Sequence, residues 1–407
     1  MEMDSPTGTH LLSLPVEMLQ LICSFATPHD LLNIRLASRD LEAAALDAFG
    51  REYLDQVACF LLEPARLQRV NDILSTKHLA HRVSGVLLTF KAFEATESDC
   101  IHLAAKKNEP LEVARQDASE AYTLEKYQNI PLGGCLDWKL LGRLLRRVSA
   151  LRRCSLQLEL LADLEAADNL LSPQHPDLAA SIISPAVAMG CRIDELYLSD
   201  RYLTGLSDYL KMPSNQLSLL TKNLETFGFH KKMHTIDDIA SGEALEAVQL
   251  ILDASRSLQN LVLTLHASVN LWDNDALTDL TPRILSAVKS RYIKDLQLAD
   301  MQMRLKDFLT MLDRWHTTLE GLDSHDICLL DDGDPWGEVL KKLKTMPQLD
   351  GFWFDSLHKE GPTEELPFYA HFYDRPGMGA ISVGLADGKV AVQELLELNL
   401  RNGILYS

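Results

Sequence analysis

The sequence predicts a mixed α/β protein in which a small helical domain, residues 10–55, precedes a long domain of alternating short strands and helices, residues 56–407. Two observations support this prediction. Three helix starts with capping residues follow one another near the N-terminus. Beyond them, a short apolar pattern followed by a helical one returns at intervals of about 26 to 35 residues, the range in which one supersecondary unit repeats.

The first helix is predicted to begin at Pro15. Proline at the first position of a helix loses no hydrogen bond, and Glu17 places a negative charge near the positive end of the helix dipole. An apolar face follows at the spacing i, i+3, i+4, i+7, made of Met18, Leu21, Ile22 and Phe25.

The second and third helices have similar starts. Thr27 is a predicted N-cap with Pro28 after it, and the Asp30 carboxylate is placed to accept hydrogen bonds from free backbone amides. Ser38 is expected to cap the third helix, and Gly50 to end it in a left-handed conformation. Three helices of this length cannot bury all their apolar surface among themselves. The surplus indicates docking, either on the rest of the chain or on a partner.

The residues of this segment resemble an F-box. The match consists of Leu14, Pro15, Glu17, Leu19, Ile22, Phe25, Asp30, Leu31, Leu32, Arg35, Leu36, Ser38 and Arg39. The resemblance implies binding to a Skp-type adaptor and, through it, membership of a cullin-RING ubiquitin ligase. The adaptor-binding residues would be Leu14, Pro15, Glu17, Leu19, Ile22, Phe25, Leu31, Leu32, Arg35 and Leu36. The bulky aromatic residue that many F-boxes carry after the Ser-Arg pair is absent, since residues 43–45 are alanines. The alternative is a helical cap that covers the end of a larger domain.

The composition fits an adaptor that binds proteins. With 39 basic and 58 acidic residues, the net charge of -19 disfavours nucleic acid and anionic membranes as partners and favours a basic one. The opening residues resemble no signal peptide, and no stretch is apolar enough to span a bilayer, so a cytoplasmic or nuclear location is expected. The seven scattered cysteines are expected to be reduced and buried.

The second domain is predicted from the repeated form apolar-x-x-apolar-x-apolar. It occurs at Ile193, Leu196 and Leu198; Leu224, Phe227 and Phe229; Leu258, Leu261 and Leu263; and Ile293, Leu296 and Leu298, with less regular copies beginning at Leu319 and Leu349. Helices are expected between them at residues 245–252, 280–288, 305–315 and 336–343, and an earlier strand at 81–90.

This rhythm resembles an irregular leucine-rich repeat, in which short parallel strands pair into a curved sheet and each packs on its own helix. The asparagine that usually follows the strand is missing, and the repeats are longer than usual. The alternative is a single α/β domain with leucine-rich strands. An F-box followed by such repeats resembles the F-box proteins abundant in filamentous fungi.

The side chains between the strand leucines are predicted to share the concave face and to bind a protein target, with a basic segment the best fit. They are Glu195, Tyr197, Thr226, His230, Asn260, Asp295, Gln297, Asp323, Trp353 and Asp355, with Thr264 and His325 beside them. A charged excursion from the sheet is expected at about residues 91–138.

Motifs of catalysis and cofactor binding are missing from the sequence. The pair His230 and His234 has the spacing of two metal ligands on a helix, but no third ligand is near in sequence, and the lysines between them indicate a solvated loop. We therefore expect no metal, no cofactor and no enzymatic activity. Three hypotheses remain: the substrate receptor of an SCF-type ubiquitin ligase, a leucine-rich interaction scaffold with a helical cap, and an enzyme whose active residues leave no local motif.

Overall fold

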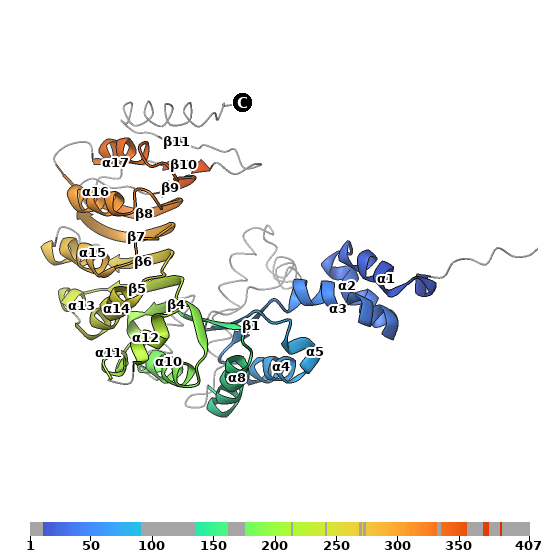
Figure 1. Ribbon diagram of the computed structural model, residues 1–407. Helices are drawn as coiled ribbons and strands as arrows, with labels where there is room; N and C mark the ends of the chain where they lie inside the picture. Colours follow the sequence, from blue (N-terminus) through green and yellow to red (C-terminus); the bar gives the residue numbers. More distant parts are fainter. Residues whose placement is uncertain are drawn as a thin grey trace, which may run out of the picture. The chain divides into compact units, whose positions relative to one another are not determined.

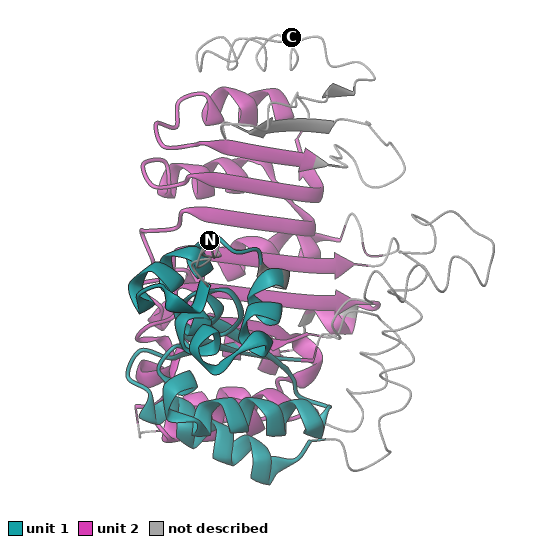
Figure 2. Cartoon of the chain, turned by 90° about the vertical axis from the view of Figure 1, so that its right-hand side faces the viewer, with its two compact units in different colours: residues 1–89, 134–157 teal, residues 90–133, 158–407 magenta. Residues whose placement is uncertain are grey.

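The computed structural model describes residues 11–90, 136–161, 176–212, 215–240, 242–267, 271, 274–331 and 335–355, with two strands at 369–373 and 383–384. These residues form a mixed α/β structure, as predicted. The chain divides into two compact units, unit 1 of residues 1–89 and 134–157 and unit 2 of residues 90–133 and 158–407 (Figure 2). The predicted excursion at 91–138 lies outside the described residues, apart from its last three.

The N-terminal part of unit 1 is helical, with a short turn of 3₁₀ helix, η1 (Leu11–Ser13), before α1 (Val16–Ser24), α2 (Pro28–Ala37) and α3 (Arg39–Tyr53). Both predicted caps are confirmed. The Thr27 hydroxyl accepts from the backbone N–H of Asp30 at 3.2 Å, and the Ser38 hydroxyl accepts from that of Leu41 at 3.2 Å. The Asp30 carboxylate in turn accepts from the Thr27 hydroxyl at 2.7 Å.

The predicted stop at Gly50 is wrong, because α3 continues through Gly50 to Tyr53. The glycine is explained by close packing instead. A Cβ atom at Gly50 would lie 2.6 Å from Cδ of Arg82, whose guanidinium pairs with Asp47 of the same helix.

The rest of unit 1 holds a parallel strand pair, β1 (Gln56–Phe60) and β2 (Gly85–Thr89), with α4 (Pro64–Ser75), α5 (Lys77–Ala80) and α8 (Trp138–Ala150). The strand expected at 81–90 is β2. Buried Asn71 of α4 donates to the carbonyl oxygens of Leu67 at 2.9 Å and Leu140 at 3.1 Å, which ties α4 to α8.

In unit 2 six strands pair in parallel in the order of the chain (Figure 1). They are β4 (Arg192–Ser199), β5 (Thr226–Met233), β6 (Asn260–Ala267), β7 (Asp295–Arg304), β8 (Gly321–Leu330) and β9 (Gly351–Asp355). The border between the units falls within β3 (Ser155–Leu160). Two antiparallel strands, β10 (Tyr369–Tyr373) and β11 (Val383–Gly384), follow β9, so the expectation of parallel strands alone is wrong at this end.

Helices connect the strands of unit 2 and cover one side of its sheet (Figure 1). They are α10 (Leu178–Ala188), η2 (Asp200–Tyr202), α11 (Leu206–Leu210), α12 (Gln216–Thr221), α13 (Ile236–Ala240), α14 (Gly242–Ala254), α15 (Asp275–Ala287), α16 (Leu305–Arg314) and α17 (Pro335–Leu343). The last four confirm the helices expected at 245–252, 280–288, 305–315 and 336–343.

The core of unit 2 lies between the sheet and these helices. One row of paired residues crosses all six strands, and each member is buried: Leu196, Phe227, Leu261, Leu296, Leu322 and Phe352. These are strand positions that the apolar pattern predicts. Each strand therefore buries one face and leaves the other for polar side chains.

Strands β4 to β8 contain 8 to 10 residues each, so they are longer than the short strands expected. In β7 the backbone of Asp300 is left-handed, with φ 55°, and in β8 that of Asp326 is too, with φ 47°. Such a residue interrupts the alternation of faces. In β7, accordingly, the buried apolar residues change from Leu296 and Leu298 to Met301 and Met303.

Candidate functional site

The helices α1 to α3 have a small core of their own. Leu19 and Cys23 of α1 and Leu31 of α2 pack with Ala44, Ala45 and Ala48 of α3. Leu19 is 5% exposed and Leu31 3%, so two of the ten residues expected to bind an adaptor stabilise the helices and offer no surface. Alanines on α3 let the other helices approach closely enough to enclose the larger side chains.

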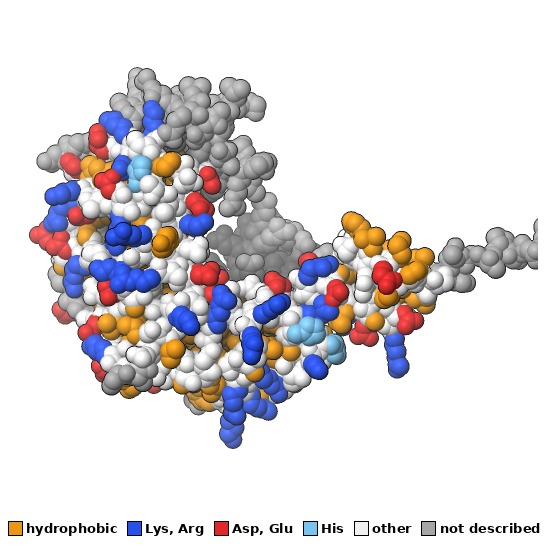
Figure 3. Space-filling view, in the orientation of Figure 1, with side chains coloured by type: hydrophobic (Ala, Val, Ile, Leu, Met, Phe, Trp, Pro, Cys, Tyr) orange, Lys and Arg blue, Asp and Glu red, His pale blue; other side chains and the backbone are white. Residues whose placement is uncertain are grey.

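A second apolar set on the same helices is exposed. The predicted stripe of Met18, Leu21, Ile22 and Phe25 is exposed, as are Leu32 and Leu36 of α2, together with Leu11, Leu12 and Val16. We call these nine residues the apolar face. Phe25 is 82% and Leu36 86% exposed, and Figure 3 shows hydrophobic side chains gathered on these helices. A small unit with apolar side chains on two sides of a helix offers one of them to a partner.

The other residues expected to bind an adaptor are only partly available. Leu14 packs against the small core. Arg35 is turned toward its own unit, because its guanidinium lies 3.8 Å from the centre of the Phe49 ring and 3.5 Å from Glu42. Pro15 and Glu17 are exposed.

The predicted target-binding residues of unit 2 lie on the polar side of the sheet in three rows. Paired strand positions place Glu195, Thr226, Asn260 and Asp295 in the first row; Tyr197, Gln297, Asp323 and Trp353 in the second; and His230, Thr264, His325 and Asp355 in the third. Thr226 is buried and accepts a hydrogen bond of 3.0 Å from the Asn260 amide, so it offers no contact. The side chain of Asp355 lies outside the described part of the chain.

Glycines leave gaps in these rows that the apolar pattern alone did not reveal. The first row ends with Gly321 and Gly351, paired next to Asp295 across β8 and β9. In the second row Gly228 follows Tyr197, whose ring occupies the space that a Cβ atom there would need. A side chain beside a glycine can lie flat against the sheet.

The gap at Gly321 and Gly351 forms a hollow of about 380 Å³ at the start of β7, β8 and β9. Besides the two glycines and the strand backbones, its lining consists of Asp295, Gln297, Glu320, Asp323, Asp350 and Trp353. Sequence reasoning identified four of these six as face residues. It missed Glu320 and Asp350, which stand directly before β8 and β9, because only the register shows that they lie beside the same gap.

The other end of the face is also acidic. Burial raises the pKa of the Glu195 carboxyl above its usual range, and the carboxylates of Asp194, Glu159 and Glu225 raise it further. Burial, together with the carboxylates of Glu195 and Glu159, raises the pKa of Tyr197 to about 12. Negative charges that raise one another's pKa favour a cationic ligand.

Two histidines interact with carboxylates on this side of the sheet. Nδ1 of His266 lies 3.4 Å from Asp300, and Nε2 of His325 lies 2.9 Å from Asp323. Burial raises the pKa of the Asp300 carboxyl, and nearby His266 opposes this shift. The His325 ring is also 6.3 Å from the Trp353 ring, measured between centres.

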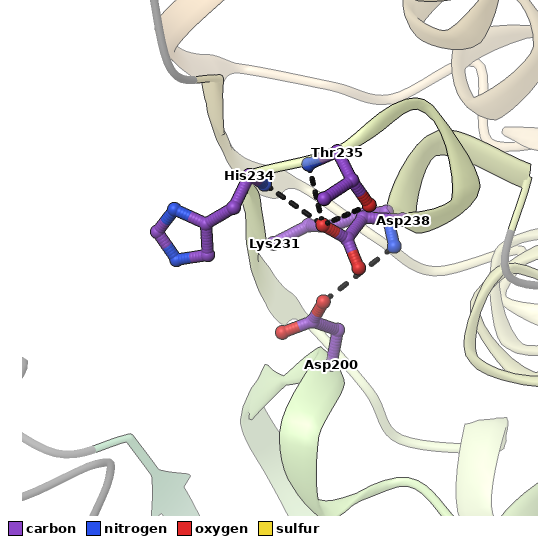
Figure 4. Close-up of polar contacts among 5 residues, drawn as sticks. All are labelled: Asp200, Lys231, His234, Thr235 and Asp238. Atoms are coloured by element: carbon purple, nitrogen blue, oxygen red, sulfur yellow. Dashed lines mark hydrogen bonds and ion pairs between the residues drawn. The ribbon is translucent and has the colours of Figure 1, made fainter.

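The segment with His230 and His234 is mainly a strand, so the expectation of a solvated loop is wrong. It belongs to β5 up to Met233, and Lys231 is 1% exposed, with Nζ 3.5 Å from Oδ2 of Asp200 (Figure 4). The lysine is buried because alternate strand residues point into the protein, where Asp200 supplies a counter-charge.

Within the described residues no group of three or more His, Cys, Asp or Glu side chains is arranged to hold a metal ion, and no helix is long and apolar enough to cross a membrane. Five cysteines of this part of the chain, Cys23, Cys59, Cys154, Cys191 and Cys328, are buried and in the thiol form, as expected. Comparisons of the sequence with protein-family models and with curated proteins find no match in either set.

Proposed function

We propose that this protein is the substrate-recognition subunit of an SCF-type ubiquitin ligase. In this proposal residues 10–55 are an F-box that binds a Skp-type adaptor and, through it, a cullin-RING ligase. The strand and helix domain is a leucine-rich-repeat-like receptor for a protein target. Other subunits carry out ubiquitin transfer, so the chain requires no catalytic residue or cofactor of its own.

The two-sided helices α1 and α2 carry this proposal. Their inner side chains, such as Leu19 and Leu31, complete a core, so the outer ones are not needed for folding. Several exposed apolar side chains on one small unit, such as Phe25 and Leu36, are typical of a protein-binding surface. Helices that present such a stripe dock in the apolar groove of a helical partner.

The polar face of unit 2 supports the second half of the proposal. Its described side chains hold acidic and aromatic groups on rigid strands, and such a surface suits the capture of a basic protein segment. A receptor of this kind separates its tasks, because the adaptor contacts apolar side chains of unit 1 while the target contacts polar side chains of unit 2.

A pull-down with a purified Skp-type adaptor tests the proposal. The variant Phe25→Ser with Leu36→Ser removes two exposed anchors and leaves the small core intact. We expect wild type to bind and the variant to lose affinity at least about tenfold, since truncation of an anchor costs ~2 kcal/mol or more. Leu14 is less suitable for substitution because it packs against the core.

The chain offers a matched control in unit 2, where Met212 is 53% and Leu219 51% exposed. Met212→Ser with Leu219→Ser removes two exposed apolar side chains elsewhere, and adaptor binding should be retained. Failure of the wild type to bind would contradict the ligase role and leave an interaction scaffold with a helical cap. Equal loss in both variants would show that binding is not specific to the apolar face.

A further inference from the structure

The hollow at β7, β8 and β9 is large enough to receive one side chain. Its volume of about 380 Å³ lies at the lower end of the range typical of ligand sites, ~300–1,000 Å³. Gly321 and Gly351 create it by omitting two neighbouring side chains from the first row. The Asp295 carboxylate extends over this gap, since a Cβ atom at Gly321 would lie 2.5 Å from its Oδ1.

An aromatic side chain forms part of the wall. Trp353 is half-buried, and it stands next to Asp323 in the second row. A tryptophan face attracts a cation that lies over it, and a planar guanidinium stacks on it better than an ammonium group does.

Negative charge dominates the lining. The four carboxylates are those of Asp295, Glu320, Asp323 and Asp350. Basic side chains lie beside two of them: Nζ of Lys294 is 2.8 Å from Glu320, and Nε2 of His325 is 2.9 Å from Asp323. The described lining itself contains these four carboxylates and no lysine or arginine, so it favours a cationic ligand.

We propose that this hollow binds an arginine side chain of the target protein, with the guanidinium over Trp353 and hydrogen-bonded to Asp323 and Asp295. The assignment of the arginine to a protein target rests on the proposed function. The choice of arginine follows from the combination of a tryptophan in the lining with carboxylates from neighbouring strands, because the guanidinium can donate from a planar fork while it stacks on an aromatic ring.

Nuclear magnetic resonance of the full chain with ¹⁵N-labelled tryptophan tests this proposal. The five indole groups give separate signals, and Trp353→Phe identifies the one at the hollow. The probe is a blocked pentapeptide with one arginine among glycine and serine. Matched peptides carry lysine or citrulline, the latter having nearly the shape of arginine without its charge. We expect a saturable shift of the Trp353 signal with arginine, a weaker response with lysine and none with citrulline.

Two variants test whether the Asp323 carboxylate binds the arginine side chain. Asp323→Asn removes a charge from the hollow with little change in volume and should weaken binding of the arginine peptide about tenfold. Asp253→Asn is the control, because Asp253 is an exposed carboxylate of α14 that is absent from the lining of the hollow. It should leave the affinity unchanged.

Three results would each overturn the proposal: a Trp353 signal that does not move, equal responses to arginine and lysine or citrulline, or unchanged affinity in Asp323→Asn. The experiment contains no adaptor, so its failure is distinct from failure of the proposed function. Arginine binding together with no adaptor binding would keep the site and remove only its assignment to a ligase target.

Discussion

Among the charged residues of unit 2, the buried pair of Lys231 and Asp200 is expected to affect the free energy of unfolding most. Lys231 and Asp200 form a pair 3.5 Å apart, with the lysine almost fully enclosed. Burial raises the pKa of the Asp200 carboxyl, and the attraction of Lys231 opposes this shift. Removal of the lysine would leave a buried carboxylate without its counter-charge, which is more destabilising than the presence of the pair is stabilising.

We expect Lys231→Met to lower the free energy of unfolding by about 3 kcal/mol. Urea denaturation followed by circular dichroism measures it. The matched control is Lys222→Met, which removes an exposed lysine from the end of α12 and should change stability little. Replacement of the whole pair, Lys231→Met with Asp200→Leu, should recover most of the loss. If Lys231→Met is as stable as wild type, the lysine is not enclosed as described.

Tyr197 makes stability depend on pH in the alkaline range. Its pKa is raised from 10.0 to about 12. The contribution of the protonated tyrosine to the free energy of unfolding is therefore fully present below pH 10 and is lost as the pH rises through 12. In this window the unfolded chain binds fewer protons than the folded one, so stability falls with pH. We expect Tyr197→Phe to make this fall shallower, as measured by urea denaturation at several pH values. Parallel curves for both proteins would contradict the shift.

Among the elements, α13 has a start that depends on one carboxylate. Asp238 accepts from the backbone N–H groups of His234 at 2.8 Å and Thr235 at 2.7 Å, and from the Thr235 hydroxyl at 3.0 Å (Figure 4). Burial opposes the charged form, but these hydrogen bonds outweigh it and hold the pKa of Asp238 below its usual value.

We expect Asp238→Ala to cost about 1 kcal/mol near pH 7, as the loss of a cap does. Because the pKa is lowered in the folded state, this contribution is present above the usual pKa of an aspartate and is lost as the pH falls through the folded-state value. The difference from wild type should therefore shrink at about pH 2, a trend that thermal unfolding at both pH values measures. A difference independent of pH would mean that the carboxylate charge is not what stabilises the turn.

The elements were predictable where their causes are local. The caps Thr27 and Ser38, the helices α14 to α17 and the buried strand leucines all follow from short-range patterns. Gly50 was misjudged because its neighbour in space, Arg82, is remote in sequence. The apolar residues of α1 could not be divided into inner and outer sets from spacing alone, since Leu19 and Ile22 both fit an apolar stripe.

The candidate site on the sheet was predictable only in outline. Alternation along each strand identifies the face residues. The prediction that Thr226 contacts a target is wrong, because Thr226 is buried and hydrogen-bonded to Asn260 of the next strand. The hollow depends on Gly321 and Gly351 being paired. Strand register is a property of pairing between distant segments, so sequence spacing within one repeat does not supply it.

At the scale of the whole molecule, the described parts of both units have cores of their own. The small core of α1 to α3 includes Ala45, which is fully buried, while the core of unit 2 includes fully buried Leu263 of β6. Compact units with cores of their own can lose structure separately when one core is damaged. The proposed division of labour therefore has a measurable consequence.

We expect Ala45→Leu, which overfills the helical core at a cost of about 1–3 kcal/mol, to speed hydrogen exchange in α1 to α3 and not in β5 to β8. Leu263→Ala, which leaves a cavity costing about 2–5 kcal/mol, should do the reverse. Mass spectrometry of exchanged peptides measures both. If either variant speeds exchange throughout the chain, the units unfold together, and loss of adaptor binding in Phe25→Ser with Leu36→Ser would no longer identify the adaptor surface. If each effect stays local, substitutions on one unit can be interpreted without reference to the other.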